Sequence, residues 1–465
     1  MKCVVGIDLG STTTKAVLLD EQGQTVGQGI TNSRSNYEVA CAVAREEALW
    51  SARLGLLERS LGTLAREDRV RTHALGAALP EAFRFEVYLD QLADLRSELF
   101  KCLDRLEPRA LRQTLGPPLR DITDEMERGA PALFDGSGAR KSDFFRDLAG
   151  AAFMGAAERA CAGGRLPFER LAGLFDRAVL DVETRMTARS FDARVRRAIE
   201  RRNEESPRAK ALVRDLAATT SIDEVAFVGT GYGRQTLPFP KESVRSEILC
   251  HGRGAHALFP GTRTVLDIGG QDTKAIQVDE GGVVTSFQMN DRCAAGCGRY
   301  LGYIADELGL GLHELGPLAL GAHRVVRVNS TCTVFAGAEL RERLALGQRR
   351  EDILAGLHRA MMLRGMSLLA RSGGVRDEFT FTGGVCKNAM ATKVLHELVA
   401  EHYGSGITVN IHPDSIYMGA RGAALFALDD YRAGRAGLLP RFAHGTTPPE
   451  EPPCGQTEPL ARGEP

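Results

Sequence analysis

Two segments in opposite halves of this chain follow one pattern. In each, an Asp ends an apolar, strand-like run, and a turn with Gly and hydroxyl or amide side chains leads into another strand-like run. The segments are Asp8-Leu9-Gly10-Ser11-Thr12-Thr13-Thr14-Lys15 and Asp267-Ile268-Gly269-Gly270-Gln271-Asp272-Thr273-Lys274. Gly permits close approach of the backbone to a ligand, and successive N–H and hydroxyl groups can face a phosphate. One such turn is usually only a hairpin turn, but two predict two related lobes that grip one triphosphate from both sides.

These two loops supply most of the predicted site. Asp8 and Asp267, at the strand ends, are expected to act in catalysis by holding a magnesium ion, Asp8 through water. Gln271 is a candidate for hydrolysis, although a hydrogen bond that holds the turn explains it equally well. The residues expected to contact the nucleotide from these loops are Gly10, Ser11, Thr12, Thr13, Lys15, Gly269, Gly270 and Asp272.

A third segment follows the two loops. An apolar strand, Phe379 to Thr382, leads into a Gly-Gly turn that would let the backbone lie flat against a purine or ribose. Alone, this is any strand, turn and helix. After two phosphate loops it predicts an adenosine site that includes Gly383, Gly384 and Asn388.

Together the three segments resemble the superfamily of acetate and sugar kinases, heat-shock chaperones and actin, over roughly 1–32 and 220–428. The resemblance implies an α/β, two-lobed actin-like ATPase fold, of the duplicated ribonuclease H-like type, that binds ATP and Mg²⁺. Glu247 lies where an acidic residue of this superfamily helps to orient the attacking water; a Glu favoured by a helix N-terminus is the alternative. The chain has no Gly-x4-Gly-Lys-Ser/Thr phosphate loop, and Gly229 to Gly233 lack the dinucleotide-binding spacing.

Two further segments, Asn290 to Leu301 and Asn329 to Ala336, each contain a Cys among Gly, Ser and Thr. Cys293 and Cys332 are expected at helix starts, where the positive end of the helix dipole favours a thiolate. Thiolates are ligands of iron, but two cannot complete the four-thiolate set of a cubane cluster. A second subunit is therefore expected to supply the other two.

These two Cys segments resemble the activator ATPases of 2-hydroxyacyl-CoA dehydratases and the ATP-hydrolysing subunits of benzoyl-CoA reductase, the BadF/BadG/BcrA/BcrD ATPase family. The resemblance implies a [4Fe-4S] cluster that bridges a dimer, with Cys293 and Cys332 as ligands from this chain. Cys297 is interpreted as a spectator, with an alternative role as a ligand. The implied partners are a homologous smaller ATPase subunit that shares the cluster, substrate-reducing iron–sulfur subunits, and reduced ferredoxin as the electron donor.

Between the N-terminal strands and the next strand, apolar residues recur at three- and four-residue spacing, which predicts a mainly helical region. Within it, an Arg cluster alternates with acidic residues, which favours a solvated helix face. The cluster comprises Arg194, Arg196, Arg197, Arg201 and Arg202. The expected division of the chain is 1–32 and 221–262 as the N-terminal lobe, 33–220 as the helical insertion with its lead-in helix, 263–428 as the C-terminal lobe with the cluster cysteines, and 429–465 as a flexible tail.

The helical insertion discriminates between functions. Dehydratase activators are compact, whereas the larger ATPase subunit of class I benzoyl-CoA reductase is similar to this chain in carrying an extra region. The first hypothesis is therefore an oxidoreductase subunit that couples ATP hydrolysis to low-potential electron transfer for reductive dearomatisation of benzoyl-CoA. The alternatives are the activator ATPase of a 2-hydroxyacyl-CoA dehydratase and, from another class, a small-molecule kinase with structural cysteines.

Charge and hydropathy exclude other partners. Lys plus Arg (59) nearly balances Asp plus Glu (60), so we expect neither nucleic acid nor an anionic membrane as a partner. The N-terminus lacks the pattern of a signal peptide, and no apolar run approaches the roughly 18 to 20 residues that cross a bilayer. We therefore expect a cytoplasmic protein, in which clustered cysteines bind metal rather than form disulfides.

Overall fold

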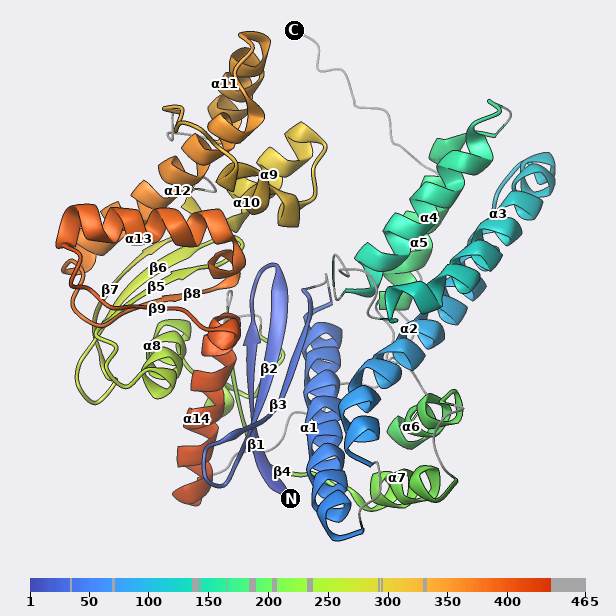
Figure 1. Ribbon diagram of the computed structural model, residues 1–465, viewed down its shortest axis with the longest axis horizontal. Helices are drawn as coiled ribbons and strands as arrows, with labels where there is room; N and C mark the ends of the chain where they lie inside the picture. The colour runs from blue at the N-terminus through green and yellow to red at the C-terminus, as the bar shows by residue number, and fades with distance from the viewer. Residues whose placement is uncertain are drawn as a thin grey trace, which may run out of the picture.

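The computed structural model describes residues 1–33, 36–68, 72–135, 142, 144–164, 166–183, 190–202, 207–231, 237–291, 293, 296–328 and 333–435. Two lobes, each built on one β-sheet, lie side by side, and a helical module extends from the first of them (Figure 1). In the part of the chain that is described, no helix is both long enough and apolar enough to span a membrane.

The N-terminal lobe contains a four-stranded sheet in the order β3-β2-β1-β4. β1 runs antiparallel to β2 and parallel to β4. The strands are β1 (Lys2–Leu9), β2 (Thr13–Asp20), β3 (Thr25–Asn32) and β4 (Asp223–Gly231). Successive side chains of a strand point to opposite faces, so Val5 and Ile7 pack under helix α1 (Tyr37–Asp68), whereas Val4 packs under α14 (Met418–Arg432). This two-sided cover explains why β1 is apolar at nearly every position.

The C-terminal lobe repeats the design in a five-stranded sheet in the order β7-β6-β5-β8-β9. The strands are β5 (Thr264–Ile268), β6 (Thr273–Val278), β7 (Val284–Asn290), β8 (Phe379–Thr382) and β9 (Val409–Asn410). Asp8 lies opposite Lys15 across β1 and β2, and Asp267 lies opposite Lys274 across β5 and β6. The two phosphate loops therefore occupy equivalent positions in two related sheets.

Helices cover both faces of the second sheet. Five of them follow β7 or β8 in the chain: α9 (Gly298–Leu308), α10 (Leu312–Leu320), α11 (Thr333–Ala345), α12 (Arg350–Ser372) and α13 (Ala389–Tyr403). The main apolar core of this lobe joins α9, α10, α12 and α13 to β5 and β8. α8 (Glu247–Leu258) packs on the other face, where Ile248 and Ala255 contact Val265 and Ile276.

Helix α14 returns the chain to the first lobe. Its Ala420, Ala423 and Ala424 pack with β1, β2 and β4, and it also lies against α8 (Figure 1). The helix continues to Arg432, past residue 428, where the sequence analysis ends the C-terminal lobe. Helices α8 and α14 thus link the two sheets.

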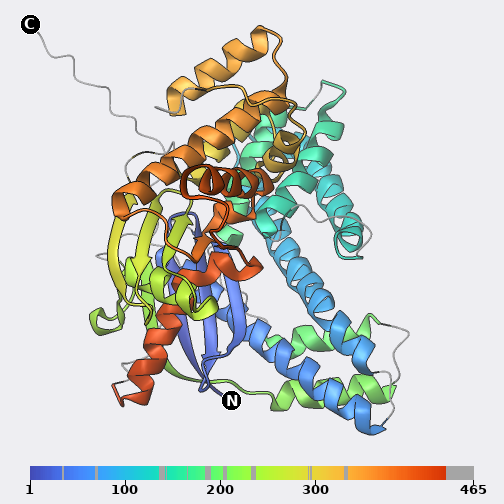
Figure 2. The same cartoon turned by 60° about the vertical axis from the view of Figure 1, so that its left-hand side comes forward.

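Between β3 and β4 the chain forms a module of long helices. These are α1, α2 (Thr72–Asp104), α3 (Arg109–Gly129), α4 (Phe145–Cys161), α5 (Phe168–Glu183), α6 (Phe191–Glu200) and α7 (Pro207–Thr219). The first half of α1 covers the sheet of the first lobe, and its second half packs with α2, α6 and α7. The far half of α2 forms a separate apolar core with α3, α4 and α5, well away from the sheet (Figure 2).

The Arg cluster is only partly a solvated face: Arg196 and Arg201 are exposed, but the expectation is wrong for Arg194. Arg194 is fully buried; its Nε donates to Asp90 at 2.9 Å, and its guanidinium lies 4.7 Å from the ring centre of Trp50. Arg197 donates to both Glu86, at 2.7 Å, and Asp90, at 2.7 Å. The acids that pair with these arginines lie on α2, about a hundred residues earlier, so the local charge pattern cannot reveal them.

Candidate nucleotide site

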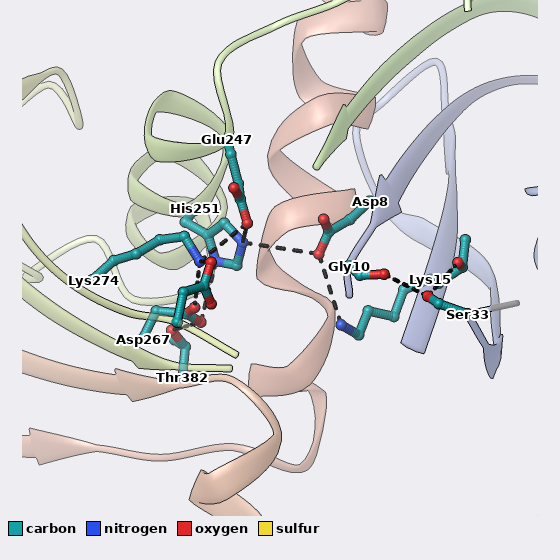
Figure 3. A network of polar contacts seen from close by, with 11 residues as sticks. Asp8, Gly10, Lys15, Ser33, Glu247, His251, Asp267, Lys274 and Thr382 are labelled. Atoms are coloured by element: carbon teal, nitrogen blue, oxygen red, sulfur yellow. Dashed lines mark hydrogen bonds and ion pairs between the residues drawn. The ribbon is translucent and has the colours of Figure 1, made fainter. Parts of the chain in front are cut away.

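The two phosphate loops touch where Thr12 of the first packs against Gly270 of the second. A Cβ atom added to Gly270 would lie 1.9 Å from Oγ1 of Thr12, so only a glycine allows the loops to meet this closely. Ser33 holds the first loop: its Oγ donates to the carbonyl of Gly10 at 2.5 Å, and its N–H donates to the carbonyl of Thr12 at 2.8 Å (Figure 3). Ser11 and Thr13 of the same loop remain partly exposed. A single phosphate-containing ligand bound at this point would contact both the first and the second phosphate loop.

Asp8 ends β1 and is only 2% exposed. Its Oδ2 lies 3.9 Å from Nζ of Lys15, while its Oδ1 is buried and has no hydrogen-bond partner among the described residues. A buried carboxylate oxygen without a partner is costly unless a ligand completes its surroundings. This orphaned oxygen fits a hydrated magnesium ion, whose ligands are oxygen atoms.

Asp267 is the equivalent residue of the second lobe and is also 2% exposed. Its carboxylate accepts a hydrogen bond from Thr382 at 2.8 Å and lies 3.4 Å from Nζ of Lys274. Burial alone would raise the pKa of Asp267, but the positive charges of His251 and Lys274 outweigh it and hold the pKa far below its ordinary value. The carboxylate is therefore ionised and paired within the protein.

Lys274 joins the remaining carboxylates. Its buried Nζ lies 2.8 Å from Asp272 and 3.0 Å from Oε1 of Glu247, the first residue of α8. Burial lowers the pKa of Lys274, but Asp267, Glu247 and Asp272 together raise it well above its ordinary value. Burial also raises the pKa of Glu247. A carboxyl group with a raised pKa, placed between the lobes, is suited to accept a proton from water.

His251 is a site residue that the sequence reasoning missed. It lies one helical turn after Glu247 on α8, and its two ring nitrogens face Asp8 and Asp267 (Figure 3). The i, i+4 spacing from Glu247 was the available signal, because that spacing places two side chains on one face of a helix. Lys274 was missed as a charged partner as well, although it stands at the same place in its loop as Lys15 does in the first.

The other predicted nucleotide residues lie beside the second loop. Gly383 has φ of +87°, and a Cβ there would lie 2.3 Å from the carbonyl oxygen of Ile268, so the Gly-Gly turn lies directly against the end of β5. Gly384 is exposed. Oδ1 of Asn388 accepts from the N–H of Ala391 at 3.0 Å and caps α13. Gln271 is partly exposed in the turn between β5 and β6.

Of the two expected cluster cysteines, Cys293 is half-buried, whereas Cys332 lies outside the described residues. The Sγ atom of Cys293 accepts a hydrogen bond from Nη1 of Arg364 at 3.2 Å. A cavity of about 430 Å³, lined in part by Arg364 and Gly296, opens beside it. Because Cys293 is only half-buried, its sulfur is accessible and fits the role of an iron ligand.

Cys293 does not start a helix as expected. α9 begins at Gly298, and the buried Cys297 occupies its N-cap position. Burial raises the pKa of the Cys297 thiol, which makes it a poorer thiolate.

The loop after Cys293 is joined to the second phosphate loop by three hydrogen bonds. The N–H of Gly298 donates to the carbonyl of Gly269 at 2.8 Å, and the N–H of Arg299 donates to the carbonyl of Gly270 at 2.7 Å. Thr273 completes the set, because its hydroxyl donates to the carbonyl of Gly296 at 2.5 Å. The second phosphate loop is therefore hydrogen-bonded to the start of α9, five residues after Cys293.

Comparison with known proteins supports this arrangement. The family model of the BadF/BadG/BcrA/BcrD ATPase family matches residues 5–427. The chain is 42% identical over 206 residues to the (R)-2-hydroxyglutaryl-CoA dehydratase activating ATPase of Acidaminococcus fermentans, a match that covers 44% of this chain and 76% of that protein. It is 36% identical over 208 residues to a benzoyl-CoA reductase subunit of Thauera aromatica, covering 44% of this chain and 72% of that protein.

The crystal structure of component A of the Acidaminococcus fermentans (R)-2-hydroxyglutaryl-CoA dehydratase has the same fold. It aligns with a TM-score of 0.52 at 22% sequence identity, over 93% of this chain and 100% of that chain. The predicted two-lobed, actin-like ATPase fold is confirmed.

Proposed function

Because this chain belongs to the BadF/BadG/BcrA/BcrD ATPase family, we propose that it is an activator ATPase that uses ATP to deliver a low-potential electron to a 2-hydroxyacyl-CoA dehydratase. The similarity to a dehydratase-activating ATPase, at 42% identity, exceeds the 36% identity to a benzoyl-CoA reductase subunit. This ranking reverses the order of hypotheses drawn from the sequence alone, which gave the insertion more weight than the ATPase lobes.

ATP binds between the lobes in this proposal. Asp8 and Asp267, both buried and on different sheets, would hold the magnesium ion of the nucleotide. Glu247 accepts the proton of the attacking water. The loop residues from Gly10 to Thr13 and from Gly269 to Asp272 supply the N–H and hydroxyl groups that bind the phosphates.

The electron carrier is a [4Fe-4S] cluster shared with a partner subunit. Cys293 and Cys332 would hold it from this chain, and two further thiolates would come from the partner. Such a cluster, when bound, supplies one-electron chemistry at low potential. Two residues of this chain position one of these cysteines: Arg364 donates to Sγ of Cys293, and Asn290 donates to the carbonyl of Cys293 at 3.1 Å.

The hydrogen bonds between the phosphate loop and the cysteine loop carry the proposal. Gly269 and Gly270 accept from the first two residues of α9, so the loop that would hold the γ-phosphate and the loop that would hold iron form one unit. A kinase needs no such link, because its product is formed at the phosphate itself. An ATP-driven electron carrier needs one.

A second candidate is the ATPase subunit of a benzoyl-CoA reductase. The helical module from α1 to α7 favours it, because more than half of the chain lies outside the match to the compact dehydratase activator. The two candidates share the nucleotide site and the cluster and differ only in the electron acceptor.

The first test is the metal content of the protein. We expect anaerobically purified protein to contain iron and to give the electron paramagnetic resonance signal of a reduced cubane cluster. Cys293→Ala and Cys332→Ala remove the ligands and should lose both the iron and the signal. Cys161→Ala, at the half-buried end of α4, is the matched control and should keep both. Wild-type protein that hydrolyses ATP without binding iron would refute the proposal.

A further inference from the structure

The side chain of His251 contacts acidic residues that belong to both lobes. Its Nδ1 lies 3.2 Å from Oδ1 of Asp267 on β5, and its Nε2 lies 3.8 Å from Oδ2 of Asp8 on β1. Nε2 also lies 3.9 Å from Oε1 of Glu247. Among the described residues, His251 is the one side chain within ion-pair distance of both strand-end carboxylates (Figure 3).

The surroundings fix the ring between these carboxylates. His251 is 5% exposed and lies on α8, which packs against the second sheet. On the other side stands the first turn of α14, where Gly419 leaves room for the pair: a Cβ there would lie 2.6 Å from Oδ2 of Asp8 and 2.7 Å from Nε2 of His251. The positive end of the α14 dipole therefore also lies beside the Asp8 carboxylate.

The lysines of the site cannot replace this link. Lys15 contacts Asp8 in the first lobe, and Lys274 contacts Asp267 in the second. Each amine is a point charge on a flexible stem and serves one lobe. An imidazole instead presents two nitrogens at a fixed separation on a rigid ring.

We propose that His251 is a positioning residue for ATP hydrolysis, which holds Asp8 of one lobe and Asp267 of the other in a single arrangement. The ring neither touches the phosphates nor moves a proton in this role. It keeps the two carboxylates in the same relative position as the lobes move relative to each other. The proposal rests on ATP hydrolysis at this site and not on the electron acceptor.

Two substitutions separate the two ends of the ring. In His251→Asn the amide can replace only the nitrogen that faces Asp267, and in His251→Gln it can replace only the nitrogen that faces Asp8. Steady-state ATP hydrolysis is measured without any electron acceptor. We expect kcat to fall about 10- to 100-fold in both variants, as for other misplaced catalytic groups, while KM for ATP changes about threefold or less, because the phosphate loops remain intact.

The matched control is His256→Asn on the same helix, since His256 hydrogen-bonds the carbonyl of Glu280 away from the site. It should keep the wild-type kcat. Wild-type kcat in both His251 variants would overturn the proposal. A loss of ATP affinity and of thermal stability in proportion to the loss of kcat would also overturn it, because His251 would then be a structural residue. Failure of electron transfer in the wild type would leave these kinetic results unaffected.

Discussion

The individual residues of the nucleotide site are mostly buried and charged. Asp267, Asp272 and Glu247 all lie within 3.4 Å of Nζ of Lys274, and all are largely buried. Ions taken out of water are stable only when their partners satisfy them, and removal of one partner leaves the others uncompensated. Lys274 is therefore as important for the folded site as the acids it pairs with.

Replacement of Lys274 by Met tests this dependence. Three buried carboxylates would lose their shared cation, so we expect the free energy of unfolding of this lobe to fall by about 3 to 5 kcal/mol. Urea unfolding followed by circular dichroism measures the change. Lys393→Met, at an exposed position on α13, is the control and should have almost no effect. Equal stability of the two variants would show that Lys274 is not needed to balance the acids.

The acids of this site could be predicted from the sequence, but their partners could not. Asp8, Asp267 and Asp272 belong to a visible repeated loop, and Glu247 was found by its position after the central strand. The contact of His251 with Asp8 depends on the way α8 and α14 pack between two sheets. No local pattern contains that packing. Cys293 was identified from its neighbours in the chain, whereas Arg364, which donates to its sulfur, comes from a distant helix.

Among the helices, the pairing of α6 with α2 depends on one internal ion network. Arg194 and Arg197 of α6, together with Arg201 at its C-cap, contact Glu86 and Asp90 of α2. Arg194 is fully buried, and two of its guanidinium nitrogens have no hydrogen-bond partner among the described residues. The buried positive charge of Arg194 is therefore compensated mainly by Asp90 and by the ring of Trp50.

We expect Asp90→Ala to destabilise the helical module. The substitution leaves a buried guanidinium without its carboxylate, which costs about 3 to 5 kcal/mol. Limited proteolysis should cleave the module faster, while ATP hydrolysis stays close to the wild-type rate because the network lies outside the nucleotide site. Asp121→Ala, on the exposed face of α3, should leave proteolysis unchanged. Unchanged proteolysis in Asp90→Ala would mean that Arg194 is compensated by other groups.

Helix and strand ranges were predictable where periodicity was strong. The expected strand from Phe379 to Thr382 corresponds to β8, and the region expected to be mainly helical contains α1 to α7. The start of α9 was wrong by several residues. The first two residues of that helix donate hydrogen bonds to the phosphate loop, a contact between distant segments that local periodicity does not show.

Duplication organises the whole molecule. Each lobe has three antiparallel strands, a parallel fourth strand, and an Asp opposite a Lys at the loop. The repeated motif made the fold predictable from sequence. The proposed electron acceptor could not be chosen from the sequence, because the insertion suggested one acceptor and the relatives favour another.

The most direct test of the proposed function is ATP-dependent activation of a dehydratase. This protein, a strong reductant and the electron-accepting component of a 2-hydroxyacyl-CoA dehydratase are mixed anaerobically, and formation of the enoyl-CoA product is followed with ATP or with a non-hydrolysable analogue. We predict product with ATP and none with the analogue. Equal product in both reactions, or no product while benzoyl-CoA reductase components are activated instead, would contradict the proposed function.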